Sequence, residues 1–210
     1  MDVPPNTHDP KRLVRRGYDQ ISRAYRDDRG ADNKGYPTWL DRYILPRLSQ
    51  HARVLDLGCG NGIPATRILS EHFDVTGVDI SDVQIDRARR LVPAVTFLRG
   101  DIAEIAFPSA SFDAVVSFFA LIHLPVAEQP GILQRIGDWL HPGGLFLATV
   151  GHEALTRTGE FHGAPMYWSH ADASTYCAWL AAAGIDVVER EFIPEDAHGG
   201  HELIFGQRRP

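Results

Sequence analysis

The sequence predicts an α/β fold built on a mostly parallel sheet, and three observations support this prediction. From residue 53 onward, apolar runs of strand length alternate with segments of helical period, which is typical of β-α-β units. The glycine turn GCGNG directly follows the first apolar run, where parallel sheets commonly bind ligands. Two strands near the carboxyl-terminal end are separated by a short turn and are therefore expected to pair in antiparallel fashion.

The elements follow in order along the chain. Strands are expected at 53–57, 73–78, 95–98, 112–117, 145–150, 187–193 and 202–206. A helix at 63–72 tolerates Pro64 in its first turn, where no hydrogen bond is lost. Ser81 and Gln84 have the spacing of a capping box and predict the start of a second helix. A third helix at 130–140 is expected to stop at the sequence HPGG, and a fourth, at 171–183, to stop at Gly184.

The remaining segments complete the predicted organisation. Residues 1–50 are expected to form an amino-terminal helical cap, with helices between 11 and 50 packed on one edge of the sheet. Residues 51–210 are expected to form the core. A polar, glycine-rich and aromatic stretch at 151–169 is too long for a plain connector, so a lid or binding loop is expected there.

Composition excludes several classes of function. The 210 residues are 44% hydrophobic and 23% charged, which suits one globular core, and the net charge is -6. Basic residues are scattered, so nucleic acid is not an expected partner. The first residues are polar and proline-rich, and no segment stays apolar long enough to span a membrane. The only two cysteines, Cys59 and Cys177, cannot form a disulfide framework, so a cytoplasmic location is expected.

The glycine turn, VLDLGCGNG, carries information about its ligand. Glycines allow close approach of the backbone and positive φ. A dinucleotide fingerprint needs a small residue where this chain has Ile63. Asp56, two residues before the first glycine, would repel a pyrophosphate and attract an ammonium group. The turn therefore favours a ligand with a positively charged end.

Two further acids indicate the other parts of the ligand. Asp79 ends the second strand, about twenty residues beyond the glycines, where an acid can bind both ribose hydroxyls. Asp101 follows the third strand and is placed to accept a hydrogen bond from an exocyclic amine such as that of adenine. An ammonium group, a ribose and an adenine together describe S-adenosyl-L-methionine.

From about Tyr18 to Gln207, the sequence resembles class I S-adenosylmethionine-dependent methyltransferases of the small-molecule type. The motifs that carry the resemblance are VLDLGCGNG, VTGVDIS, FLRGDIAEIAF, FDAVVSFFALIHL and LHPGGLFLATV. The resemblance implies a Rossmann-like, seven-stranded sheet with one antiparallel strand and helices on both faces. It also implies methyl transfer from S-adenosyl-L-methionine, with S-adenosyl-L-homocysteine as product.

The resemblance further implies a set of cofactor contacts. Asp56 and the glycine turn would hold the methionine part, Asp79 the ribose, and Ile80 and Asp101 the adenine. The full set expected to bind the cofactor is Tyr18, Tyr25, Asp56, Gly58, Cys59, Gly60, Gly62, Asp79, Ile80, Gln84, Asp101, Ile102 and Phe118.

Acceptor residues are expected after the fourth strand and in the 151–169 stretch. His123 is the candidate general base, although a histidine there could equally anchor its loop. The other candidates could line the acceptor site, or they could serve only to pin the loop by aromatic packing. The full candidate set is Phe119, His123, His152, His162, Met166, Tyr167 and Trp168.

No metal site is expected, because the run Glu195, Asp196, His198, His201 and Glu202 matches no standard set of ligands. The expected acceptor is a small molecule, and the aromatic-rich lid suggests a flat or apolar one, for example from secondary metabolism. The receiving atom (oxygen, nitrogen or carbon) and the oligomeric state are left open. The alternatives are a methyltransferase acting on protein or nucleic acid, a nicotinamide-dependent oxidoreductase, and a non-catalytic binding module.

Overall fold

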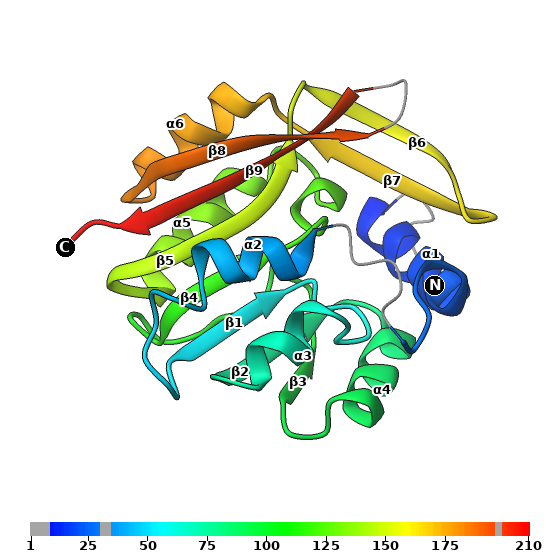
Figure 1. Cartoon of the computed structure of the whole chain (residues 1–210). Helices are drawn as coiled ribbons and strands as arrows, with labels where there is room; N and C mark the ends of the chain where they lie inside the picture. Colours follow the sequence, from blue (N-terminus) through cyan, green and yellow to red (C-terminus); the bar gives the residue numbers. More distant parts are fainter. Residues whose placement is uncertain (1–8, 30–34, 196–198) are drawn as a thin grey trace, which may run out of the picture.

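The computed structural model describes residues 9–29, 35–195 and 199–210. Its centre is a seven-stranded sheet in the order β3-β2-β1-β4-β5-β9-β8 (Figure 1). These strands are β1 (Arg53–Leu57), β2 (Asp74–Asp79), β3 (Thr96–Arg99), β4 (Phe112–Ser117), β5 (Leu140–Gly151), β8 (Ile185–Glu195) and β9 (Gly199–Arg208). The predicted α/β fold class is therefore confirmed.

The pairing of the strands defines where a ligand can bind. β1 pairs in parallel with β2 on one side and with β4 on the other, so the chain order reverses beside β1. In open parallel sheets, such a switch point opens a crevice at the carboxyl ends of the strands. β9 runs antiparallel to both β5 and β8, which confirms the one antiparallel strand that was expected.

Helices cover both faces of the sheet because successive strand residues point to opposite sides. Val54 packs in the apolar cluster that includes α2 (Tyr36–Tyr43) and α3 (Ala65–Ser70). Leu55 packs in the cluster that includes α5 (Gln129–Trp139) and α6 (Ala173–Ala182). Both side chains are fully buried, so the sheet is a core layer between two helical layers.

Helix α1 (Pro10–Tyr25) has a different position from the other helices. Asp9 caps it by accepting a hydrogen bond from the Lys11 amide at 3.0 Å, and Pro10 occupies its first turn. The helix lies beside β7 (Ala164–His170) and α4 (Asp82–Leu91), at the right of Figure 1. The expectation that helices of residues 11–50 share one edge is wrong for α2, because Tyr43 packs against Phe205 on a sheet face.

Most of the 151–169 stretch forms a regular hairpin, so the expectation that it is a loop is wrong, whereas its role as a lid stays a prediction. β6 (Leu155–Phe161) pairs with β7 around a two-residue turn formed by His162 and Gly163. Both turn residues have positive φ, 50° and 83°, which suits the right-handed twist of the paired strands.

Two local expectations also need correction. The sequence HPGG was expected to stop a helix, but it lies inside β5, which begins at Leu140. The pairing of β5 with β4 shifts its register there, between Phe112 and Ala114. Only half of the capping box forms. The Ser81 hydroxyl accepts a hydrogen bond from the Gln84 amide at 3.1 Å, whereas the Gln84 side chain bonds to Ser22 of α1.

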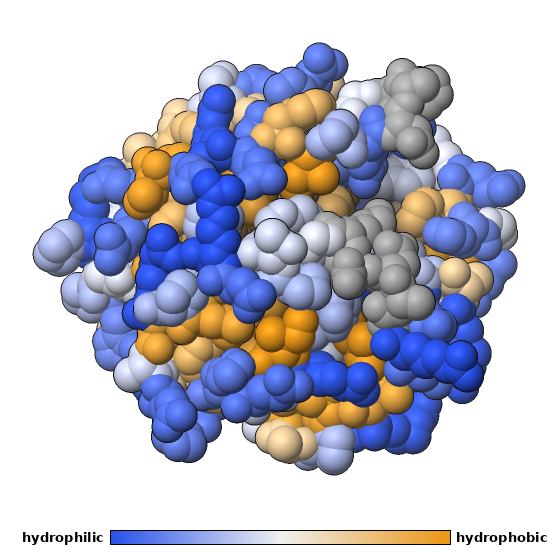
Figure 2. All heavy atoms as spheres, in the orientation of Figure 1, coloured by the Kyte–Doolittle hydropathy of each residue, from blue (hydrophilic) through white to orange (hydrophobic). Residues whose placement is uncertain are grey.

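On the face shown in Figure 2, hydrophilic side chains surround several separate hydrophobic areas. Within the described part of the chain, no helix is both long and apolar enough to cross a membrane.

Candidate active site

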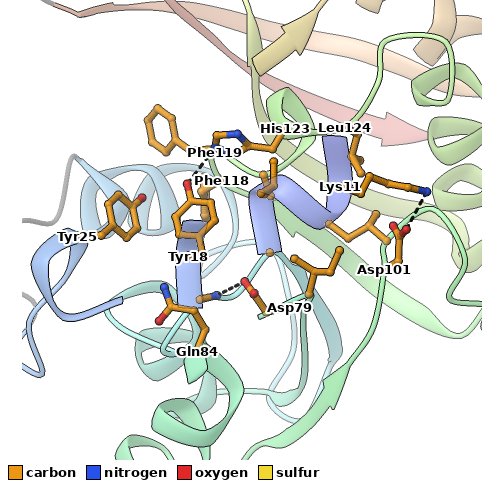
Figure 3. Close-up of a pocket in the computed structure, with 16 residues that line it drawn as sticks. Lys11, Tyr18, Tyr25, Asp79, Gln84, Asp101, Phe118, Phe119, His123 and Leu124 are labelled. Carbon is orange, nitrogen blue, oxygen red and sulfur yellow. Dashed lines mark hydrogen bonds and ion pairs between the residues drawn. The ribbon is translucent and has the colours of Figure 1, made fainter. Parts of the chain in front are cut away.

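A cavity lies at the carboxyl ends of β1, β2 and β3, and α1 contributes to its wall (Figure 3). The glycine turn forms one wall and a short helical turn, η1 (Leu121–His123), forms another. The lining residues are Lys11, Val14, Tyr18, Tyr25, Gly58, Gly60, Asp79, Ile80, Gln84, Asp101, Ile102, Phe118, Phe119, Ala120, His123 and Leu124. The cavity thus occupies the crevice that the strand order defines.

Asp79 joins the glycine turn to the start of α4. Its Oδ2 accepts a hydrogen bond from the Gly60 amide at 2.9 Å, and its Oδ1 accepts one from the Ser81 amide at 2.8 Å. Burial raises the pKa of Asp79 to about 6, although these two hydrogen bonds lower it. The carboxylate is therefore fixed in orientation and faces the cavity.

Asp56 lies deeper, in an adjoining cavity that is also lined by Tyr25, Gly58 and Phe118. It is 2% exposed and accepts a hydrogen bond from the Thr66 hydroxyl at 2.6 Å. Burial raises the pKa of Asp56 to about 7 despite this bond. Because burial disfavours the ionised form of a carboxyl group, a cationic ligand group beside Asp56 would stabilise that form strongly.

Arg26 faces the same inner cavity, and the sequence analysis did not identify it. Its guanidinium donates to the Ile63 carbonyl at 2.7 Å and to the Tyr36 hydroxyl at 3.0 Å. The guanidinium carbon also lies 4.9 Å from the centre of the Tyr36 ring. Arg26 and Asp56 therefore offer one positive and one negative group in one chamber, as an α-amino acid requires.

Asp101 follows β3 and faces the outer cavity. Its Oδ1 accepts a hydrogen bond from the Ala103 amide at 2.8 Å, and its Oδ2 lies 2.8 Å from the ammonium of Lys11. The same ammonium lies 3.0 Å from Glu128. Partial burial lowers the pKa of Lys11, but its bonds to Asp101 and Glu128 outweigh that effect and raise it. Lys11 is therefore charged and ties α1 to the cavity wall.

His123 is 6% exposed and held at both ring nitrogens. Nδ1 lies 2.7 Å from the Tyr167 carbonyl, which can only accept, so Nδ1 carries the proton. Nε2 lies 2.9 Å from the Tyr18 hydroxyl (Figure 3). Burial lowers the pKa of His123 to about 4, so the ring is neutral at pH 7 and Nε2 accepts from Tyr18.

Most of the predicted cofactor residues meet in these two cavities. The outer cavity contains Tyr18, Tyr25, Gly58, Gly60, Asp79, Ile80, Gln84, Asp101, Ile102 and Phe118, and the inner one adds Asp56 and Cys59. Gly62 lines neither cavity. A side chain at Gly62 would meet Val92 and Phe97 instead, so its role lies in packing α4.

The predicted acceptor residues divide into two groups. Phe119 and His123 line the outer cavity. His152 and Trp168 border a separate cavity beside β8 and β9. The others serve the hairpin itself, because His162 forms its turn, Met166 packs against α1, and Tyr167 holds His123 through its carbonyl.

Helix α1 contributes cavity residues that the sequence analysis missed. Lys11 and Val14 line the cavity together with Tyr18 and Tyr25. Their spacing of three, four and seven residues places all four side chains on one helical face. That periodicity was visible in the sequence and would have identified them.

The structure gives no support for a metal site within the residues it describes, where no group of three or more histidine, cysteine, aspartate or glutamate side chains could hold an ion. Asp196 and His198 of the run considered above lie outside the described residues.

Comparison with known proteins identifies the fold and the domain. Residues 54–144 match the family model described as "Methyltransferase domain". Over nearly its whole length, the chain superposes on 1,6-didemethyltoxoflavin-N1-methyltransferase from Burkholderia thailandensis. The TM-score is 0.73 at 21% identity, and the match covers 100% of this chain and 94% of that one.

Sequence relatives give the same result for part of the chain. Sterol 24-C-methyltransferase erg6 from Aspergillus fumigatus is 38% identical over 47% of this chain and 28% of its own length. The 27-O-demethylrifamycin SV methyltransferase from Amycolatopsis mediterranei is 34% identical over 60% of this chain and 49% of its own length. The chain therefore spans less than half of the length of these relatives.

The fold and the match define a class I S-adenosylmethionine-dependent methyltransferase fold, which confirms the resemblance inferred from the motifs.

Proposed function

We propose that this protein is an enzyme that transfers a methyl group from S-adenosyl-L-methionine to a small-molecule acceptor. The observation that carries the proposal is the alignment of Asp56, Asp79 and Asp101 at the ends of three adjacent strands, facing two joined chambers. Each acid matches a different part of the donor. When bound, the donor supplies an electrophilic methyl group on a sulfonium.

The chemistry of the inner chamber fits the amino acid part of that donor. Asp56 would bind the ammonium and Arg26 the carboxylate, and both groups are already directed by other bonds. A nicotinamide dinucleotide fits less well, because the buried Asp56 at the end of β1 would oppose its pyrophosphate.

The outer chamber fits the nucleoside part. Asp79 would accept hydrogen bonds from the ribose hydroxyls, and Asp101 from the adenine amine. Ile80 and Ile102 supply apolar contacts for the adenine ring. In this arrangement the protein's main contribution is alignment, which can supply roughly 7 to 11 kcal/mol of barrier reduction.

We infer that α1 and the β6–β7 hairpin act as the lid over this site. Val14, Ile21, Ala164 and Met166 form one apolar cluster between them. On its other side, α1 is bonded to α4, where the Ser22 hydroxyl donates to Gln84 at 2.7 Å. Exclusion of water by such a lid strengthens electrostatic contacts in the site.

Similarity alone does not choose the acceptor atom, because the names of the three relatives refer to carbon, oxygen and nitrogen methylation. A small-molecule acceptor is supported by the position of the cavity beside α1, where Phe118, Phe119 and His123 line it. The two free cysteines, Cys59 and Cys177, support a reducing, cytoplasmic setting.

Calorimetric titration with S-adenosyl-L-homocysteine and, separately, with NADH tests the donor. We expect the first to bind and the second to give no saturable heat. Binding of NADH in place of the homocysteine compound would contradict the proposal. A second assay, which follows acceptor-dependent conversion of donor to product, separates an enzyme from a binding module.

A further inference from the structure

The hydroxyl of Tyr18 is hydrogen-bonded to Nε2 of His123, and both residues line the cavity. The two rings meet edge to face, with centroids 5.4 Å apart and an interplanar angle of 84°. Tyr18 belongs to α1, whereas His123 belongs to η1, and 105 residues separate them in the chain. The lid therefore places a phenol on the cavity side of the candidate base.

The tautomer of His123 determines what this atom can bind. Because Nδ1 donates to the Tyr167 carbonyl, Nε2 of the neutral ring has a lone pair and no proton. Its partner in the cavity must then be a hydrogen-bond donor. A hydroxyl satisfies this requirement, whereas an ether oxygen or a carbonyl does not.

Aromatic side chains lie close to the His123 ring. Phe118 and Phe119 are both buried and line the cavity, and the Trp168 ring lies 5.9 Å from the His123 ring. Phe119 is held in a left-handed conformation, with φ of 54°, and its amide donates to the Thr149 hydroxyl. Such strain in a residue with a Cβ is typical of functional sites. These aromatic side chains suit a flat aromatic ring.

We propose that Tyr18 stands in for the acceptor, and that the acceptor is a flat aromatic compound whose phenolic hydroxyl displaces the Tyr18 hydroxyl from Nε2 of His123. The inference rests on the proposed function and adds the class of acceptor and the receiving atom, oxygen. Tyr18 then fills the acceptor site while the lid is closed and no acceptor is bound.

The test uses the full chain saturated with S-adenosyl-L-homocysteine and a matched pair of probes. 2-Naphthol carries the hydroxyl, and 2-methoxynaphthalene keeps the ring and the oxygen but cannot donate a hydrogen bond. Because the ether would leave a buried acceptor without a partner, we expect wild type to bind 2-naphthol about ten-fold more tightly. Calorimetry gives both dissociation constants.

Tyr18→Phe provides the critical comparison, since it removes the competing hydroxyl and keeps the ring. We expect 2-naphthol to bind several-fold more tightly to Tyr18→Phe than to wild type, with the ether unchanged. Equal dissociation constants of 2-naphthol and 2-methoxynaphthalene for the wild type would overturn the proposal. A ratio of the two constants that Tyr18→Phe leaves unchanged would also overturn it.

A readout on wild type guards against a variant that folds poorly. In protein labelled with ¹⁵N-histidine, 2-naphthol should shift the Nε2 resonance of His123 while Nδ1 stays protonated. An unchanged Nε2 resonance at saturating 2-naphthol would also overturn the proposal. Failure of S-adenosyl-L-homocysteine to bind would instead contradict the proposed function, and the naphthol titration without it would still test the His123 site.

Discussion

The ammonium of Lys11 lies 2.8 Å from Oδ2 of Asp101, so a side chain of α1 already occupies the acid that follows β3. The adenine amine of the proposed donor is expected at this same carboxylate. Glu128 holds the ammonium from the other side at 3.0 Å. The contact therefore links the position of α1 to whether Asp101 is bound by the donor.

Replacement of Lys11 should therefore loosen the lid. In Lys11→Met, we expect faster association of S-adenosyl-L-homocysteine, by several-fold, because no bond to Asp101 has to be exchanged. The free energy of unfolding should fall by about 1 kcal/mol, as for a partly exposed ion pair. Stopped-flow binding measures the rate, and Lys11→Arg, which keeps the charge, is the control. Equal association rates in all three proteins would show that Lys11 does not restrain entry.

Binding of S-adenosyl-L-homocysteine should depend on pH through Asp56. Its pKa of about 7 in the empty protein means that the carboxyl group is half protonated near neutral pH. Since an ammonium ligand needs the ionised form, affinity should fall about ten-fold as the pH falls from 8 to 6. Calorimetry at several pH values measures this, and Asp56→Asn should remove most of the dependence.

The raised pKa of Asp56 also affects the stability of the ligand-free protein, which should fall as the pH rises, whereas ligand affinity should increase. A carboxyl group with a raised folded-state pKa contributes stability below its unfolded pKa, and this contribution is lost as the pH rises through about 7. Thermal unfolding of the ligand-free protein should therefore show that Asp56→Asn gains stability relative to wild type as the pH rises from 5 to 8. A constant difference between the two proteins would contradict the assigned shift.

Arg26 should recognise only the amino acid end of the ligand. In Arg26→Met, loss of a charged hydrogen bond, worth about 1.5 to 3 kcal/mol, should weaken S-adenosyl-L-homocysteine binding by roughly 10- to 100-fold. Methylthioadenosine, which lacks the amino and carboxylate groups, serves as the matched ligand and should bind both proteins alike. An equal loss for both ligands would mean that Arg26 acts through folding of the chamber.

The close packing of α1 on the hairpin can be tested at Gly17. A Cβ at this position would lie 2.8 Å from the end of Met166 and 2.9 Å from the Pro165 carbonyl. Gly17→Ala should therefore cost about 1 to 3 kcal/mol of stability and weaken ligand binding, despite the better helix propensity of alanine.

Gly131 in α5 supplies the matched control for this substitution, because no atom lies within 4 Å of a Cβ built there. Gly131→Ala should stabilise the protein by about 0.4 to 1 kcal/mol. Chemical denaturation measures both changes. Similar effects of the two substitutions would show that α1 is not pressed against β7.

The sequence predicted the sheet well because strands of the core obey local rules. The apolar runs and the glycine turn fixed the position of β1 and of Asp79, and adjacent strand ends brought Asp79 and Asp101 to one edge. The hairpin was missed because the polar, glycine-rich and aromatic composition of residues 151–169 was taken for that of a loop. Its turn, at His162 and Gly163, carries only one glycine.

Contacts between distant segments were the part that the sequence could not supply. Nothing local indicates that Lys11 meets Asp101, that Tyr18 meets His123, or that Gln84 bonds to Ser22 instead of completing its capping box. Each of these contacts depends on where α1 docks. Docking is decided by packing over the whole hairpin and α4, and a single helix sequence does not determine that packing.

The most direct test of the donor site compares two acids at opposite ends of one strand. Asp79 ends β2 at the cavity, whereas Asp74 begins it at an exposed position. Calorimetric titration with S-adenosyl-L-homocysteine should give wild-type affinity for Asp74→Ala and a loss of at least ten-fold for Asp79→Ala, with both variants folded by circular dichroism. Equal affinity in the two variants, or no binding to the wild type, would contradict the account.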